Sequence, residues 1–154
     1  MPYVQRREGR VVGLYANEQP GYAEEFLAED HPEVLAFLTP PETLDAYAAR
    51  RRWEIETGGL VVGGAAIRTD RESQALINGA LSLVQTDPTA TIEFKGAAGW
   101  STLDAAQMTA IALAVGRHVQ KAFSAERTIS EAIASQEITT VEEIDDTFAA
   151  LMAP

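Results

Sequence analysis

The chain has 154 residues, of which 46% are hydrophobic and 23% are charged, a balance typical of one globular domain with room for a small second module. It contains no cysteine, which excludes disulfides, thiolate metal sites and a cysteine nucleophile. Twenty-three acidic residues against 12 basic ones give a formal charge of −11. This acidity argues against general DNA or RNA binding, which needs a basic surface.

Two short runs of β-forming residues, at 3–7 and 10–17, open the chain on either side of a Glu-Gly pair. They predict a small hairpin, and a third extended piece is expected near Phe26. Residues 30–33, Asp-His-Pro-Glu, predict a helix start, because proline suits the first turn and acids suit the positive helix end. Because a two-stranded hairpin is marginal by itself, we expect this unit to pack on another surface.

Residues 39–43, Thr-Pro-Pro-Glu-Thr, form the predicted linker. They separate an amino-terminal β-hairpin and helix module at 1–38 from a larger domain at 44–154. A Thr-x-x-Glu pattern inside the linker also predicts the cap of the next helix. That helix is expected to end near Arg51.

A three-stranded antiparallel sheet is expected after this helix. Apolar and acidic residues alternate at 53–57, and a Gly-Gly pair separates this run from the second run at 60–67. The second run turns back through another Gly-Gly pair. A third alternating run lies at 91–95.

A helix is predicted between the second and third runs. A Thr-x-x-Glu capping box at Thr69 marks its start, and Pro88 marks its end. Apolar residues at three- and four-residue spacing are expected to face a core. They are Leu76, Ile77, Ala80, Leu81 and Val84.

The longest helical pattern opens at residues 101–104, Ser-Thr-Leu-Asp, and continues to the region of Ser135. Without a break this helix is about 50 Å long at 1.5 Å per residue. That length exceeds what a domain of this size needs for its own core. Either the helix kinks near Ser124, or its distal half packs against a partner or a second copy. A further Thr-x-x-Glu pattern at Thr140 predicts a short final helix, and the whole pattern predicts an α+β fold.

No arrangement of catalytic or metal-binding residues stands out. His31 is interpreted as a residue beside a helix cap, and His118 as a partly buried structural residue, since neither belongs to a His-Glu-x-x-His pattern. The glycine pairs lack the order of a P-loop or a dinucleotide-binding turn. We therefore predict no catalytic residue, no cofactor and no metal site. No apolar run approaches the roughly 20 residues of a membrane-spanning helix, so no membrane partner is expected.

The phrases TGG, TDRESQ, TLDA and HVQ occur in this order within residues 51–148. On these phrases the chain resembles a domain of unknown function from tailed bacteriophages and prophages, found in small tail proteins and at the ends of tail-fibre proteins. The stretch VVGLYANEQPGYAEEFLAEDHPEV resembles the opening of small proteins encoded beside tail-fibre genes, some of them fibre assembly proteins. Within these phrases, TDRESQ is interpreted either as a helix cap with a solvated first turn or as a recognition surface.

The resemblance implies a non-enzymatic tail or tail-fibre-associated protein that binds other proteins, as a virion component or as a fibre assembly factor. The expected partners are a tail-fibre or other tail protein and further copies of the chain. The expected location is the host bacterial cytoplasm during assembly, and the tail for a virion component. Two alternatives stay open. One is an enzyme acting on the cell envelope, which needs convergent carboxylates in a pocket; the other is an acidic inhibitor of a host defence protein.

Candidate interaction residues come from one tryptophan and from the long helix. Trp100, which lies between Gly99 and Ser101, is the tryptophan expected to be more exposed, and exposed aromatic residues are common binding hot spots. The long helix carries an apolar stripe at three- and four-residue steps, and its distal part is expected to contact a second copy or a fibre. The residues assigned to this contact are Val119, Phe123, Ile129 and Ile133.

Overall fold

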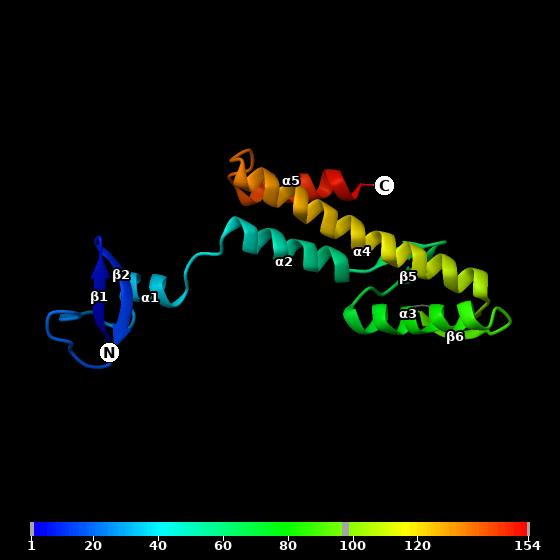
Figure 1. Ribbon diagram of the computed structural model, residues 1–154, viewed down its shortest axis with the longest axis horizontal. Coiled ribbons are helices and arrows are strands. Elements are labelled where there is room, and N and C mark those ends of the chain that lie inside the picture. Colours follow the sequence, from blue (N-terminus) through cyan, green and yellow to red (C-terminus); the bar gives the residue numbers. More distant parts are fainter. Residues whose placement is uncertain (1, 97–98, 154) are drawn as a thin grey trace. The chain divides into compact units, whose positions relative to one another are not determined.

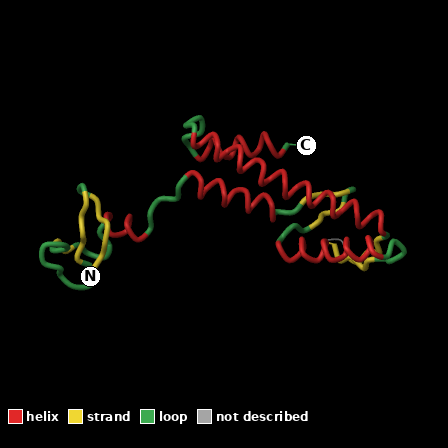
Figure 2. Tube along the Cα trace, viewed as in Figure 1, coloured by secondary structure: helices red, strands yellow, loops and turns green. Residues whose placement is uncertain are grey.

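The computed structural model describes residues 2–96 and 99–153, and it divides into two compact units, Met1–Thr43 and Leu44–Pro154. Helices and small antiparallel sheets occupy both units (Figure 2). This arrangement confirms the predicted α+β class. The two units are taken separately below.

The amino-terminal unit is a three-stranded antiparallel sheet followed by one short helix. β1 (Tyr3–Arg7) lies between β2 (Arg10–Tyr15) and β3 (Glu25–Phe26), and α1 follows at Pro32–Leu38. The turn between β1 and β2 holds Glu8 and Gly9 at positive φ, as a tight hairpin turn requires. The predicted hairpin, third strand and helix start are therefore confirmed.

Few apolar side chains are buried in this amino-terminal unit. Among its described residues, the buried hydrophobic ones are Val4, Ala23 and Val34. Larger apolar side chains remain exposed on it, namely Val12, Tyr22, Phe26, Leu35, Phe37 and Leu38. A sheet and helix of this size have little core of their own, so contact with another surface would stabilise them.

The second unit contains helices and two separate β-hairpins. Its elements are α2 (Leu44–Thr57), β4 (Leu60–Val62), β5 (Ala65–Ile67), α3 (Arg71–Thr86), β6 (Ile92–Gly96), β7 (Gly99–Leu103), α4 (Ala105–Ala134) and α5 (Val141–Met152). β4 pairs with β5 and β6 pairs with β7, both antiparallel. Within the described residues no strand ladder joins the two hairpins.

The strand predicted at 53–57 is wrong, because these residues complete α2. Alternating acids there also fit a helix, since Arg52 forms an ion pair with Glu56 one turn further on. Gly59, with a φ of +88°, adopts the left-handed conformation that suits glycine just beyond a helix end. The first Gly-Gly pair thus ends a helix, and two hairpins replace the predicted three-stranded sheet.

The strand β7 was missed by the sequence reasoning, which placed residues 101–104 at the start of the long helix. The register pairs Lys95 with Trp100 and Ile92 with Leu103, so the segment completes a hairpin with the predicted strand at 91–95. α4 begins only after this hairpin. Asp104 caps it, accepting a hydrogen bond from the main-chain N–H of Gln107 at 2.8 Å.

Of the capping boxes predicted at Thr69 and Thr140, the structure contains only the second. Asp70, rather than Thr69, caps α3, and its Oδ1 accepts from the main-chain N–H of Ser73 at 2.9 Å. The Thr69 hydroxyl is buried and accepts from the main-chain N–H of Gly59 at 2.9 Å, which fixes the chain after α2. The cap at Thr140 is confirmed as a reciprocal capping box at the start of α5.

α4 is the central element of the second unit. It runs for 30 residues without a break at Ser124, and is about 45 Å long at 1.5 Å per residue. Figure 1 shows α3 alongside one half of α4, and α2 and α5 alongside the other half. Met108, Ile111 and Val115 form one apolar cluster with α3 and the hairpins. The other cluster joins α4 to α2 and α5.

The second cluster allows a direct test of this packing. Phe148 on α5 is almost fully buried in it, whereas Leu151 on the same helix is exposed. We expect Phe148→Ala to lower the free energy of unfolding by about 3–5 kcal/mol, because the cavity cannot collapse completely. Leu151→Ala is the matched control and should cost about 1 kcal/mol or less. Urea unfolding followed by circular dichroism measures both, and equal losses would contradict the packing.

Candidate functional site

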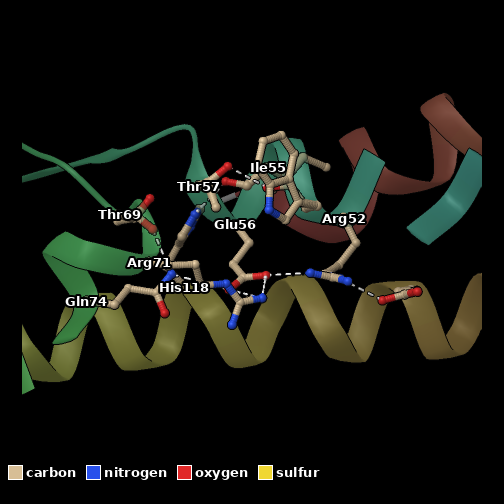
Figure 3. Close-up of polar contacts among 10 residues, drawn as sticks. Arg52, Ile55, Glu56, Thr57, Thr69, Arg71, Gln74 and His118 are labelled. Atoms are coloured by element: carbon tan, nitrogen blue, oxygen red, sulfur yellow. Dashed lines mark hydrogen bonds and ion pairs between the residues drawn. The ribbon is translucent and has the colours of Figure 1, made fainter. Parts of the chain in front are cut away.

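A buried carboxylate, Glu56, lies near the carboxyl end of α2. Its Oε2 accepts hydrogen bonds from Arg52 Nη1 at 2.5 Å and from Arg71 Nη2 at 3.1 Å. Its Oε1 accepts from Gln74 Nε2 at 3.2 Å. Figure 3 shows these side chains converging from α2 and α3 beside α4. A buried charge is tolerated only when it is paired and hydrogen-bonded, and three donors meet that condition here.

The cluster extends from Glu56 to the middle of α4. Arg52 Nε donates to Glu126 Oε2 at 2.8 Å, and the guanidinium lies 4.4 Å from the centre of the Phe123 ring. Burial by itself lowers the pKa of Arg52, but hydrogen bonds to Glu126 and Glu56 outweigh it and raise the pKa above its usual value. His118 Nε2 donates to the main-chain oxygen of Ile55 at 2.9 Å, near the end of α2.

This polar cluster holds α2, α3 and α4 together. Gln74 Nε2 also donates to the main-chain oxygen of Thr69 at 2.7 Å, so the loop before α3 is fixed as well. Among the described residues, no buried side-chain nitrogen or oxygen lacks a hydrogen-bond partner. Arg71 and Gln74 belong to the TDRESQ phrase. Part of this phrase therefore makes internal contacts, a role that neither of the two sequence interpretations included.

A second polar contact joins α2 to α5. Asp145 Oδ2 accepts from the Tyr47 hydroxyl at 2.8 Å, and its Oδ1 accepts from Arg51 Nε at 2.6 Å. Burial by itself raises the pKa of Asp145, but the hydrogen bonds from Tyr47 and Arg51 outweigh it and lower the pKa below its usual value.

An apolar groove of about 500 Å³ lies between α3 and the β6–β7 hairpin. Ile77 and Met108 are buried beside it, whereas Leu76 and Trp100 are 68% and 70% exposed. The full lining comprises Ala66, Arg68, Ser73, Leu76, Ile77, Ala80, Ile92, Glu93, Phe94, Lys95, Gly96, Trp100 and Met108. A preformed groove with large exposed apolar side chains is a surface that suits binding.

Charged side chains border this groove. Lys95 Nζ lies 5.5 Å from the centre of the Trp100 ring, within the range of a cation–π contact. Arg68 forms an ion pair with Asp70 at 3.0 Å. Glu93 accepts a hydrogen bond from the Thr102 hydroxyl at 2.9 Å. The groove therefore combines an apolar surface with a few polar groups.

The structure separates the predicted interaction residues. Trp100 borders the groove and is more exposed than Trp53, as expected. Phe123 is partly exposed, with Arg52 over its ring. The others contact the chain's own core. Val119 packs on the first cluster and Ile133 on the second.

The assignment of Ile129 to a partner contact is wrong in this fold. Its side chain is fully buried, because α2 and α5 cover that face of α4. The chain was expected to lack enough elements to cover a long helix. α2 and α5 provide this cover, through side chains such as Ala48 and Phe148.

Leu76 is the groove residue that the sequence reasoning placed wrongly, since it was expected to face the core with Ile77. Neighbouring residues on a helix point about 100° apart, so only one of them can lie at the centre of the buried face. Ile77 and Val84, two turns apart, occupy that centre. Leu76 lies at its edge and is exposed.

Two findings limit the chemistry of the described part of the chain. Within residues 2–96 and 99–153, no three His, Asp or Glu side chains are placed to hold a metal ion. In the same ranges, no helix is both long enough and apolar enough to cross a membrane.

Comparison with family models matches residues 39–149 to the domain of unknown function DUF4376. The chain belongs to this family. The DUF4376 match includes the polar cluster, the groove and the whole of α4, and it leaves out most of the amino-terminal unit. No curated protein and no solved structure gave a match. The family match confirms the part of the resemblance that concerns a domain of unknown function.

The polar cluster gives a stability prediction. Glu56→Gln keeps the shape of the side chain but removes its charge. We expect it to lower the free energy of unfolding of the DUF4376 domain by about 3 kcal/mol, because Arg52 loses one of its two carboxylates in a mostly buried position.

The matched control is Glu131→Gln, which removes the carboxylate of an exposed pair with Arg127. This change should cost about 0.5 kcal/mol or less. Chemical denaturation of both variants measures these changes in the free energy of unfolding. A Glu56→Gln variant as stable as the control would mean that the buried cluster does not hold the helices together.

Asp145 gives a prediction about pH. The folded protein lowers the pKa of Asp145, so the ionised side chain stabilises the fold fully above its ordinary pKa of 3.8. This stabilisation is lost as the pH falls through the lower pKa of the folded state. Asp145→Asn should therefore weaken the acid dependence of unfolding below about pH 5. Thermal unfolding measured across this range checks it. An unchanged pH dependence would contradict the contact with Arg51 and Tyr47.

Proposed function

We propose that this DUF4376 protein is a non-enzymatic bacteriophage or prophage tail protein that acts by binding other proteins. The observation that carries the proposal is the open apolar groove, at which Leu76 and Trp100 each expose more than two-thirds of their surface. Exposed tryptophans beside a preformed groove are typical centres of protein–protein binding. The phage assignment is supported by the sequence phrases of residues 51–148.

The amino-terminal unit supports a binding role independently. It leaves apolar side chains of α1 exposed, among them Leu35, Phe37 and Leu38, while few apolar residues are buried within it. Its sequence resembles the opening of fibre assembly proteins. A partner that covered these side chains would stabilise the unit.

The proposed partners are a tail-fibre or other tail protein, with further copies of the chain as a second possibility. The proposed contact is the groove, since the chain itself covers most of the distal stripe on α4. Such a binding surface suits both a virion component and an assembly factor that is released. They differ only in whether the protein remains in the finished particle.

Mass spectrometry of purified virions, from a phage that encodes the chain, tests the proposal. A virion component is expected among the particle proteins. An assembly factor is expected to be absent from the particle but to copurify with the fibre from infected cells. Absence from both would contradict a tail role.

Copurification with the fibre, or incorporation into virions, should also be measured for the Trp100→Ala variant. We expect binding to fall by about tenfold or more, as for the truncation of a hot-spot aromatic residue. Leu113→Ala, at an exposed apolar residue of α4 that does not line the groove, is the matched control and should bind normally. Equal binding by both variants would show that the groove is not the contact.

A further inference from the structure

The cations of the groove indicate what kind of segment it binds. Two basic residues, Arg68 and Lys95, line it, against a single acid, Glu93. With Asp70, which pairs with Arg68 beside the lining, the local charges are balanced, whereas the whole chain has a formal charge of −11.

Of the two groove cations, Lys95 is the one that has no acidic partner in the described part of the chain. Among residues 2–96 and 99–153, no carboxylate forms an ion pair with it, and its Nζ lies over the Trp100 ring. Arg68 already pairs with Asp70, and Glu93 already accepts from Thr102. The three Nζ hydrogens of Lys95 therefore remain available at the border of the groove.

Most other basic residues of this unit hold a carboxylate of the chain. Arg51 pairs with Asp145, Arg52 with Glu56, and Arg127 with Glu131. Lys95 differs from these residues, because its Nζ lies over the aromatic face of Trp100 instead of beside a carboxylate of the described chain. A carboxylate that approached here would gain an ammonium group and an apolar surface at the same place.

We propose that the groove binds an acidic segment of a partner protein. One apolar side chain of the segment packs over Ile77 and Phe94, between Leu76 and Trp100, and one carboxylate pairs with Lys95. The inference rests on the proposed protein-binding function and specifies the chemistry of its partner.

Two short synthetic peptides test this inference. In one, leucine alternates with glutamate; in the other, leucine alternates with lysine. Trp53→Phe leaves Trp100 as the single tryptophan of the full chain, so its fluorescence reports binding at the groove. We expect saturable binding of the glutamate peptide, about tenfold or more tighter than that of the lysine peptide. Net charge alone would favour the lysine peptide, so a preference for glutamate reports the local cation.

Lys95→Glu should reverse this preference, because the lysine peptide then meets the complementary charge. Arg117→Glu, at an exposed cation of α4 outside the groove, is the matched control and should leave the preference unchanged. Circular dichroism confirms that both variants fold.

Three results would overturn the inference: no saturable binding of the glutamate peptide, equal binding of the two peptides, or a preference that Lys95→Glu leaves unchanged. Each of these is distinguishable from a failure of the tail proposal, which is judged by the protein's presence in virions or with the fibre. A tail protein that ignored both peptides would keep its proposed function and lose its proposed partner chemistry.

Discussion

The packing of three helices on α4 is the constraint on which the second unit depends. α4 carries one apolar cluster at each end, and the polar cluster around Glu56 lies between them. Arg52 donates a hydrogen bond to Glu126, and His118 donates one to the end of α2. These hydrogen bonds fix the middle of α4, between the two apolar clusters. Because the two clusters share one rigid helix, a change in either one affects the same element.

This packing also decides which surface is left for a partner. α2 and α5 cover the distal half of α4, and the stripe there becomes core. The hairpin β6–β7 contributes an exposed strand and α3 contributes an exposed edge, and the groove lies between them. The proposed binding residues thus lie on α3 and on a short hairpin, and not on the longest helix.

The sequence predicted those features that depend on neighbouring residues. The cap at Thr140, the end of α3 before Pro88 and the amino-terminal hairpin all follow from local patterns. Residues 53–57 were misread because a short alternating run suits a strand and a salt-bridged helix equally well. The polar cluster around Glu56 includes a contact between Arg52 and Glu126, which are 74 positions apart, so spacing alone could not reveal it. Trp100 was the one groove residue that the sequence indicated as a binding residue, because its neighbours suggested an exposed position beside a turn.

We propose that partners contact the groove beside Trp100 and not the distal face of α4. Photo-crosslinking tests it most directly, with a benzoyl-phenylalanine placed at Trp100 in one variant and at Phe123 in another, in cells that assemble the phage. Both side chains are exposed aromatic residues of the same unit. We expect an adduct with a tail protein from position 100 and none from position 123. An adduct from position 123 alone would contradict the account.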